Sequence, residues 1–394
     1  MTGAQTGFAL ILLFIEFLDE FIYGAREAAW PLVRTDLGLS YAQIGLLLGL
    51  PKLVSGLVEP FLGVLGDVWK RRVLVLGGGV VFALALGIVG TSRGFGMLLI
   101  GFVLLSPASG AFVSLSQASL MDVDPGRRER NMVRWTFAGS IGVVLGPLAL
   151  GAGQAFDLDW RAVFIIAAVA AITAVAVGTR FSFGPSQSGA HQEQSVLGGM
   201  RTAFGAMRRA AVLRWLVLLQ FSDLMLDILL GYLALYFVDV AGASTLQASV
   251  AVATLTGVGL VGNFVLLYLL DHIGGLRYLR VTAALELVCW VAFLMVAPYS
   301  AKLIVVALLG FLSAGWYSVL KARLYETLPG QSGTVIAVNN LFGLVGAVLP
   351  WGLGVVAKHL GLQTAMWLLC LGPLALLLGL PGPMCGSGIR RKLH

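Results

Sequence analysis

Charged residues that could move protons or bind ions lie inside strongly apolar stretches of this sequence. They are Glu16, Asp19, Glu20, Arg26, Glu27, Lys52, Asp223 and Asp227. With 3.6 residues per helical turn, Glu16, Glu20 and Tyr23 fall along one stripe of a helix. Glu27 continues this stripe one turn later. Because isolated charges are costly in apolar surroundings, we expect the stripe to face a water-filled cavity or another helix.

The acids near the middle of their helices indicate proton chemistry. At 1.5 Å per residue, Asp223 and Asp227 lie roughly 15 and 21 Å along one helix. Glu16 and Glu20 lie roughly 12 and 18 Å along another, with Lys52 at a similar depth. Mutual repulsion and desolvation favour the protonated form of crowded carboxyl groups. We expect Asp223 or Asp227 to be the proton-coupling group. Glu16 or Glu20 is next, and one of them is expected to pair with Lys52. The alternative is that the acids only lock helices together.

The composition indicates a membrane protein. Of the 394 residues, 58% are hydrophobic and 11% are charged, whereas soluble domains carry about 25% charged residues. This excludes a single water-soluble globule and a disordered chain. The net charge of +7 fits Lys and Arg gathered in cytoplasmic loops, so no nucleic-acid partner is expected.

The apolar stretches predict an all-α membrane protein. A helix needs roughly 20 apolar residues to cross the bilayer, and about twelve stretches qualify. The first six are expected at 7–31, 42–66, 72–91, 96–119, 133–154 and 161–182. The second six are expected at 213–238, 247–270, 280–297, 302–321, 332–356 and 364–381. The prediction is two six-helix bundles, at 1–182 and 213–394, joined by a polar cytoplasmic linker at 183–212.

The basic residues predict the orientation, and the acids point to a repeat. With the N-terminus inside, 19 of the 26 Lys and Arg residues fall in cytoplasmic segments, so both termini are expected in the cytoplasm. The first bundle repeats in the second with a constant shift, which aligns Glu16, Glu20 and Gly24 with Asp223, Asp227 and Gly231. Duplicated six-helix halves are typical of transporters.

Other chemistries lack their usual residues. The three cysteines are far apart, and the four histidines fall in expected loops or tails. No metal site and no cofactor are therefore expected. No HExxH, GxSxG or Gly-rich nucleotide loop is found. We expect a protein that is not an enzyme and that draws energy from a proton gradient.

The connection after the second span has a characteristic spacing of glycine, acid and base. It reads GVLGDVWKRR, with its motif positions at Gly63, Asp67, Lys70, Arg71 and Arg72. It resembles the loop 2–3 signature of the major facilitator superfamily, with departures at Val68 and Lys70. We expect Asp67 and the basic cluster to close a cytoplasmic gate. The alternative is that the basic residues only set the topology.

The fifth span carries a second motif, which consists of Gly142, Gly146, Pro147 and Gly151. It resembles the helix 5 motif of the superfamily's antiporters, and the opening with LSYAQIGLLLG is similar to fosmidomycin-resistance-type efflux carriers. Related drug–proton antiporters often carry an Arg four residues before a Gly in helix 4. Here Ser106 precedes Gly110 at that spacing, so other residues must carry any proton coupling.

Aromatic and polar residues complete the candidate site. We expect a cavity lined by Tyr23, Phe112, Gln220, Trp316 and Tyr317, with Gln117, Asn339 and Asn340 as further candidates. Arg26 and Glu27 form either an outer gate pair or an ordinary snorkelling pair. Trp30 is expected to be an interfacial anchor. Glu59 and Glu286 are expected to make hydrogen bonds between helices, with a gate or relay role as the alternative.

The function expected from these features is secondary active transport by alternating access. The resemblance implies export of a small organic or drug-like compound in exchange for protons, by a monomer in the plasma membrane. The acidic cavity suits a cationic or amphipathic substrate, although Lys52 and Arg26 leave room for an anion. The alternatives are proton-coupled uptake of a metabolite, a divalent-cation carrier, and a membrane receptor or scaffold that transports nothing.

Overall fold

A computed structural model describes residues 3–68, 71–123, 128–181, 205–328 and 332–381. Throughout these ranges the chain is helical, with short connections and no strand. Eleven helical stretches are long and apolar enough to cross a membrane. The first helix, α1, has 35 residues, but its acidic and basic residues exceed what a purely apolar span carries. The predicted all-α membrane fold is confirmed.

The first six membrane segments are built from α1–α7. The single helices are α1 (Gly3–Leu37), α2 (Tyr41–Val68), α3 (Arg71–Gly90), α6 (Arg128–Ala155) and α7 (Trp160–Gly178). The fourth segment is interrupted and consists of α4 (Phe95–Ser109), a π-helical turn η1 (Gly110–Ser114) and α5 (Leu115–Val123).

The last six segments are more often interrupted. The seventh consists of α9 (Ala210–Asp223), the π-helical turn η3 (Leu224–Ile228) and α10 (Leu229–Asp239). Then follow α11 (Thr245–His272), α12 (Gly275–Met295), α13 (Tyr299–Ser313), α14 (Trp316–Thr327), α15 (Ser332–Gly346) and α16 (Leu349–Leu360). The last segment consists of α17 (Leu362–Trp367), the 3-10 turn η4 (Leu368–Cys370) and α18 (Leu371–Gly379).

Local chemistry explains two of these interruptions. Gly315 adopts φ +73° between α13 and α14, a left-handed conformation that glycine adopts without steric cost. Pro350 lies in the first turn of α16, where its missing N–H does no harm. The expected single spans at 302–321 and 332–356 are therefore each two helices.

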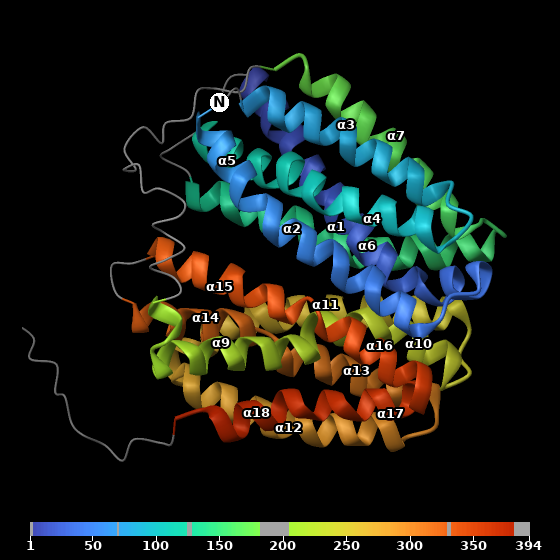
Figure 1. Cartoon of the computed structure of the whole chain (residues 1–394), viewed down its shortest axis with the longest axis vertical. Helices are drawn as coiled ribbons and strands as arrows, with labels where there is room; N and C mark the ends of the chain where they lie inside the picture. The colour runs from blue at the N-terminus through green and yellow to red at the C-terminus, as the bar shows by residue number, and fades with distance from the viewer. Residues whose placement is uncertain (1–2, 69–70, 124–127, 182–204, 329–331, 382–394) are drawn as a thin grey trace, which may run out of the picture.

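The helices run back and forth between two ends of the molecule. Figure 1 shows α1–α7 packed above α9–α18, with the helix axes running across the view. We call the end where α1 begins at Gly3 the proximal end, on the left of Figure 1, and the end where α1 stops at Leu37 the distal end. We call α1–α7 the N-half and α9–α18 the C-half.

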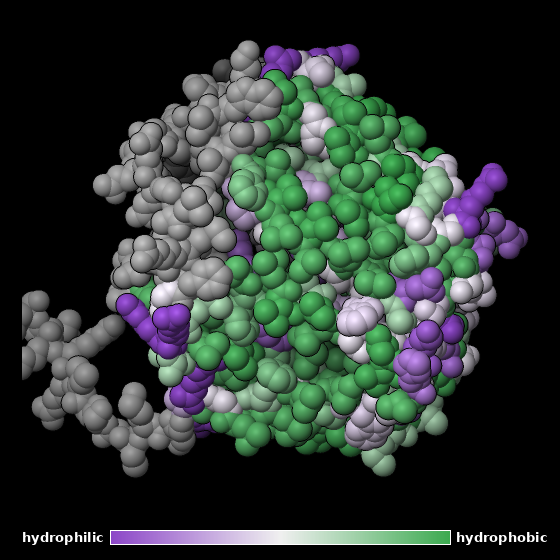
Figure 2. All heavy atoms as spheres, viewed as in Figure 1, coloured by the Kyte–Doolittle hydropathy of each residue, from purple (hydrophilic) through white to green (hydrophobic). Residues whose placement is uncertain are grey.

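The surface between the two ends is apolar. Figure 2 shows a broad hydrophobic area across the middle of one face, with hydrophilic side chains gathered toward its edges. Large apolar side chains such as Leu84, Val288 and Leu378 are exposed to the surroundings. A bilayer covers such a surface without cost, since every backbone polar group of a helix is bonded internally.

Glycines let α1 and α6 approach closely. A methyl group at Gly146 would lie 2.6 Å from the Ala25 nitrogen, and one at Gly142 would lie 2.8 Å from the Phe21 nitrogen. On the facing side, a methyl group at Gly24 would lie 2.9 Å from Pro147 Cδ. The small residues of the fifth-span motif therefore seat the acidic helix α1 directly on α6, as small residues do in membrane bundles.

Replacing Gly146 by Ala is expected to destabilise the protein. The added methyl group collides with the α1 backbone, and overpacking of this kind costs about 1–3 kcal/mol. Gly87→Ala is the matched control, because a methyl group there meets nothing within 4 Å and Ala favours the helix by about 1 kcal/mol. Thermal unfolding of both purified variants checks the prediction. An equal change in Tm for the two would contradict it.

Candidate functional site

An ion pair joins the two halves at the centre of the molecule. Lys52 of α2 lies with its Nζ 2.8 Å from Oδ2 of Asp227 in η3. The Tyr23 hydroxyl of α1 donates to Asp227 Oδ1 at 3.3 Å. The Lys52 and Asp227 side chains are 38% and 46% exposed, so the pair borders open space. The expectation that Lys52 pairs with Glu16 or Glu20 is wrong, because α2 packs along α16 of the C-half and its Lys52 side chain bonds Asp227 of η3.

A π-helical turn positions Asp227. The turn η3 covers Leu224–Ile228, so Asp227 lies within the widened part of the seventh segment. Such single turns are frequent at functional sites. Asp223 is the last residue of α9, and it interacts electrostatically with both Asp227 and Lys52. One lysine thus faces two acids of the C-half.

The three acids of α1 point to two different neighbours. Glu16 is buried, and its carboxylate lies against α6, where a methyl group at Gly139 would be 2.6 Å from Oε1. Glu20 also lies along α6, over Gly142. Asp19 faces the fourth segment, where it interacts with Ser109. Within the described residues, no three His, Cys, Asp or Glu side chains form a group that could hold a metal ion.

The central cavity lies between the two halves beside the ion pair and has a volume of about 410 Å³. Its polar lining consists of Tyr23, Ser140, Asp227, Thr256, Asn263, Ser313, Tyr317 and Ser318. Tyr23, Asp227 and Tyr317 were candidates from the sequence. Ser140 and Asn263 were missed, although a lone polar residue inside an apolar span is a usable signal for such positions.

A second cavity, which we call the side cavity, lies between α2, α4 and α15 and has a volume of about 320 Å³. Its polar lining consists of Lys52, Ser55, Glu59, Ser106, Asn339 and Asn340. The Ser55 hydroxyl donates to Glu59 Oε1 within α2, so this bond does not join helices. Lys52 lines the side cavity while its ammonium group reaches Asp227 at the edge of the central cavity.

Three expected cavity residues lie elsewhere. Phe112 is 1% exposed and packs on Phe82 with ring centroids 5.6 Å apart. Trp316 is fully buried and donates from Nε1 to the Thr282 hydroxyl at 2.9 Å. Gln220 lines a separate apolar groove between α9, α15, α16 and the last segment. These assignments are corrected: in helices apolar on every face, residue type does not reveal which face meets the cavity.

Two further expectations about buried side chains are also wrong. Trp30 is fully buried and donates to Glu27 at 2.8 Å, so it is not an interfacial anchor. Glu286 of α12 is fully buried, and neither of its carboxylate oxygens has a hydrogen-bond partner among the described residues. The expected hydrogen bond between helices is therefore not formed.

At the distal end, the contact between the halves differs from the predicted one. Arg26 and Glu27 pair with each other within α1, so they do not bridge the halves. Instead Arg34 of α1 pairs with Asp239 of α10 at 3.0 Å, and the Tyr41 hydroxyl donates to Asp239 at 2.9 Å. The sequence placed these charges at the ends of spans, where nothing distinguishes a gate pair from ordinary loop charges.

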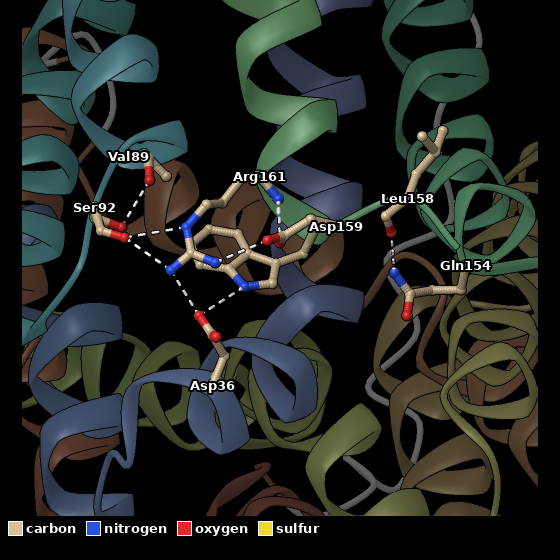
Figure 3. A network of polar contacts seen from close by, with 8 residues as sticks. Asp36, Val89, Ser92, Gln154, Leu158, Asp159 and Arg161 are labelled. Carbon is tan, nitrogen blue, oxygen red and sulfur yellow. Dashed lines mark hydrogen bonds and ion pairs between the residues drawn. The ribbon is translucent and has the colours of Figure 1, made fainter. Parts of the chain in front are cut away.

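A neighbouring polar network holds the distal end of the N-half together (Figure 3). Arg161, at the start of α7, pairs with Asp36 of α1 at 2.6 Å and with Asp159 at 3.0 Å. It also donates to the Ser92 carbonyl at 2.9 Å. Asp36 and Arg34 lie two residues apart, and they bind α1 to its own half and to the other half, respectively.

Close backbone approach completes this distal seal. A methyl group at Gly45 of α2 would lie 2.8 Å from the Trp351 Cα of α16, and Gly354 lies against the Tyr41 carbonyl. Farther along, Gly151 of α6 faces α11, where a methyl group would lie 2.9 Å from a Leu246 methyl carbon. The contacts between the halves described here run from the centre to the distal end.

At the proximal end, only part of the expected gate is described. Arg72 donates to the Thr179 carbonyl at the end of α7, a contact within the N-half. Arg71 is buried. The surroundings of Gly63, the side chain of Asp67 and all of Lys70 lie outside what the structure describes, so the gating role of Asp67 stays a prediction.

Comparisons with known proteins agree with this architecture. A family model described as Major Facilitator Superfamily matches residues 9–350. The chain is 23% identical over 392 residues to the fosmidomycin resistance protein of Escherichia coli (strain K12), covering 92% of this chain and 89% of that protein. The crystal structure of a bacterial homologue of the human lysosomal transporter Spinster, inward-facing and unoccupied, has a TM-score of 0.80 at 16% identity and covers 96% of both chains. That of a D-xylose–proton symporter has a TM-score of 0.73 at 16% identity and covers 96% of this chain and 97% of that one.

Weakening the distal seal is expected to expose the central cavity from the distal side. In a variant without native cysteines, Ser140→Cys places a thiol in the cavity. The Arg34 and Asp239 side chains are 29% and 17% exposed. Because a partly exposed ion pair contributes about 1 kcal/mol, Asp239→Asn should raise labelling by an impermeant maleimide from outside cells about fivefold. Arg323→Gln is the control, since Arg323 pairs with Glu326 within α14. Equal labelling in all variants would show that the pair does not hold the seal.

Proposed function

Because the chain belongs to the Major Facilitator Superfamily, we propose that it is a secondary active transporter that exports a small organic compound in exchange for protons. The observation that carries this proposal is the Lys52–Asp227 pair, which joins the two halves beside the central cavity. If Asp227 binds a substrate or a proton, its pairing with Lys52 changes, and with it a contact between the two halves.

Alternating access follows from the position of the contacts. The seal around Arg34 and Asp239 closes the distal end, while the two cavities lie between the halves on its proximal side. Rocking of the halves would break this seal and close the proximal end. The excess of Lys and Arg in the proximal segments supports a cytoplasmic position for this end. The proposal therefore has both termini inside and a monomer in the plasma membrane.

Proton coupling would use the link between ionisation and this contact. Ionised Asp227 accepts from both Lys52 and Tyr23. Protonation removes its charge and weakens the attraction to Lys52, so the halves separate more easily at the centre. Asp223 and the α1 acids Glu16, Asp19 and Glu20 provide further sites for protons. The energy then comes from the proton gradient, with no cofactor and no enzymatic step.

Two directions of transport are considered, export and uptake. The full-length similarity to a protein named for fosmidomycin resistance favours export. The similar fold of a D-xylose–proton symporter favours uptake with protons as the second candidate. Both use the same acids, and the sign of the proton flux separates them. A receptor or scaffold without transport would keep its function when the central acids are neutralised.

Neutralising the central acids is expected to abolish solute-driven proton movement. Proteoliposomes containing a pH-sensitive dye would be given a panel of cationic drugs, phosphonates and sugars. For the unmodified protein we expect a proton flux with at least one solute. For Asp223→Asn combined with Asp227→Asn we expect its loss, because no carboxyl group of the seventh segment then remains beside Lys52 to couple proton exchange to the contact between the halves.

Asp157→Asn is the matched control for this experiment. Asp157 lies at the distal surface with φ +56°, a conformation that Asn also tolerates. The proton flux of the Asp157→Asn variant should therefore equal that of the unmodified protein. A solute that moves without protons in both the unmodified and the doubly substituted protein would refute the coupling mechanism.

A further inference from the structure

Lys52 lines the side cavity and pairs with Asp227 of the central cavity, and this position suggests more than a static contact. Building on the proposed transport function, we propose that Lys52 is a tethered counter-ion for Asp227 that a monovalent organic cation displaces. The displaced ammonium group then moves into the side cavity and pairs with Glu59. The substrate class of the central cavity is accordingly a small organic monocation.

Asp227 is reachable from two sides. Lys52 approaches its Oδ2 atom from α2 at 2.8 Å, and the carboxylate also lines the central cavity together with Tyr23 and Tyr317. The Asp227 side chain is 46% exposed, so a molecule in the central cavity meets an acid that already holds a counter-ion. A cation binding there competes with the Lys52 ammonium group for the same charge.

The charges around Lys52 favour a cation over an anion. The acids that face or interact with it are Asp223, Asp227, Glu27 and Glu59. The other cation nearby, Arg26, is paired with Glu27 on α1 and lies over the Tyr23 ring at 5.0 Å. The fourth segment and α15 contribute only the uncharged Ser106, Asn339 and Asn340. The acids exceed the cations, so the site attracts positive charge.

The side cavity offers Lys52 a second partner. Glu59 lies seven residues after Lys52, about 10.5 Å along the same face of α2, and both residues line this cavity. The two long side chains together span this distance. Ser55 already donates to Glu59, and the amide oxygens of Asn339 and Asn340 can accept from an ammonium group. The displaced lysine therefore keeps an acidic partner in the side cavity.

We call this exchange of Lys52 between Asp227 and Glu59 the counter-ion switch. Two consequences for cation binding distinguish it from a structural salt bridge. Removing the lysine should tighten cation binding, because the built-in competitor is gone. Removing Glu59 should weaken it, because the displaced lysine then has no acidic partner in the side cavity. The second effect must vanish when the lysine is absent.

The experiment is equilibrium binding of tetraphenylphosphonium and its anionic counterpart tetraphenylborate to purified protein, without any gradient. The unmodified protein should bind the cation saturably and the anion only at background level. Lys52→Gln should bind the cation about tenfold more tightly, the gain expected when a competing bound state is removed. Lys358→Gln removes an exposed lysine of α16 and should bind like the unmodified protein.

A double-mutant cycle provides the decisive comparison. Glu59→Gln should lower cation affinity several-fold in the unmodified background and leave it unchanged in the Lys52→Gln background. Lys52→Arg keeps a positively charged competitor for Asp227, so it should bind the cation more weakly than Lys52→Gln.

Three results would overturn the proposal. They are unchanged or weaker cation binding in Lys52→Gln, preference for the anion or absence of saturable cation binding, and an equal effect of Glu59→Gln in both backgrounds. Proton flux in proteoliposomes is measured separately. If the cation affinities of the Lys52 and Glu59 variants change as expected but no solute produces a proton flux, the counter-ion switch is supported and the proposed proton coupling is wrong.

Discussion

A charge placed in an apolar chain must find water or an opposite charge, and this constraint organises the whole molecule. Lys52 and Asp227 satisfy it across the centre, Arg34 and Asp239 across the distal end, and Arg161 within the N-half. The apolar side chains that surround these contacts fit lipid as well as they fit each other. Specific positioning of the halves therefore depends on a few polar contacts and on close backbone packing, rather than on the amount of apolar surface buried.

The close packing of α1 on α6 connects this constraint to the site. Without side chains at Gly142 and Gly146, the α1 backbone lies directly on α6. The acids Glu16 and Glu20 are thereby held between the two helices, away from lipid, while Tyr23 extends to the central cavity. One helix thus carries both the buried acids and a side chain that contacts Asp227.

The sequence was sufficient for the apolar helical segments, apart from the breaks near Gly315 and Pro350, because hydropathy is a property of each segment alone. The partner of Lys52 was not predictable, since it depends on which face α2 turns toward the C-half. Trp316 and Phe112 illustrate the same limit: both lie in helices that are apolar all round, so periodicity does not separate a cavity face from a packed one. The roles of Arg34 and Asp239 also required three-dimensional information, because the two residues lie 205 positions apart.

The last turn of α1 has a consequence for how the molecule divides when it moves. Asp36 pairs with Arg161 of the N-half, and Arg34 pairs with Asp239 of the C-half. Two side chains of the same helical turn are therefore bonded to different halves of the molecule. If the halves separate at the distal end, α1 keeps its bonds to α7 and moves together with the N-half. The boundary between the moving halves then runs between α1 and α10. Arg34 loses its partner Asp239 and leaves a positive charge at the edge of the distal opening.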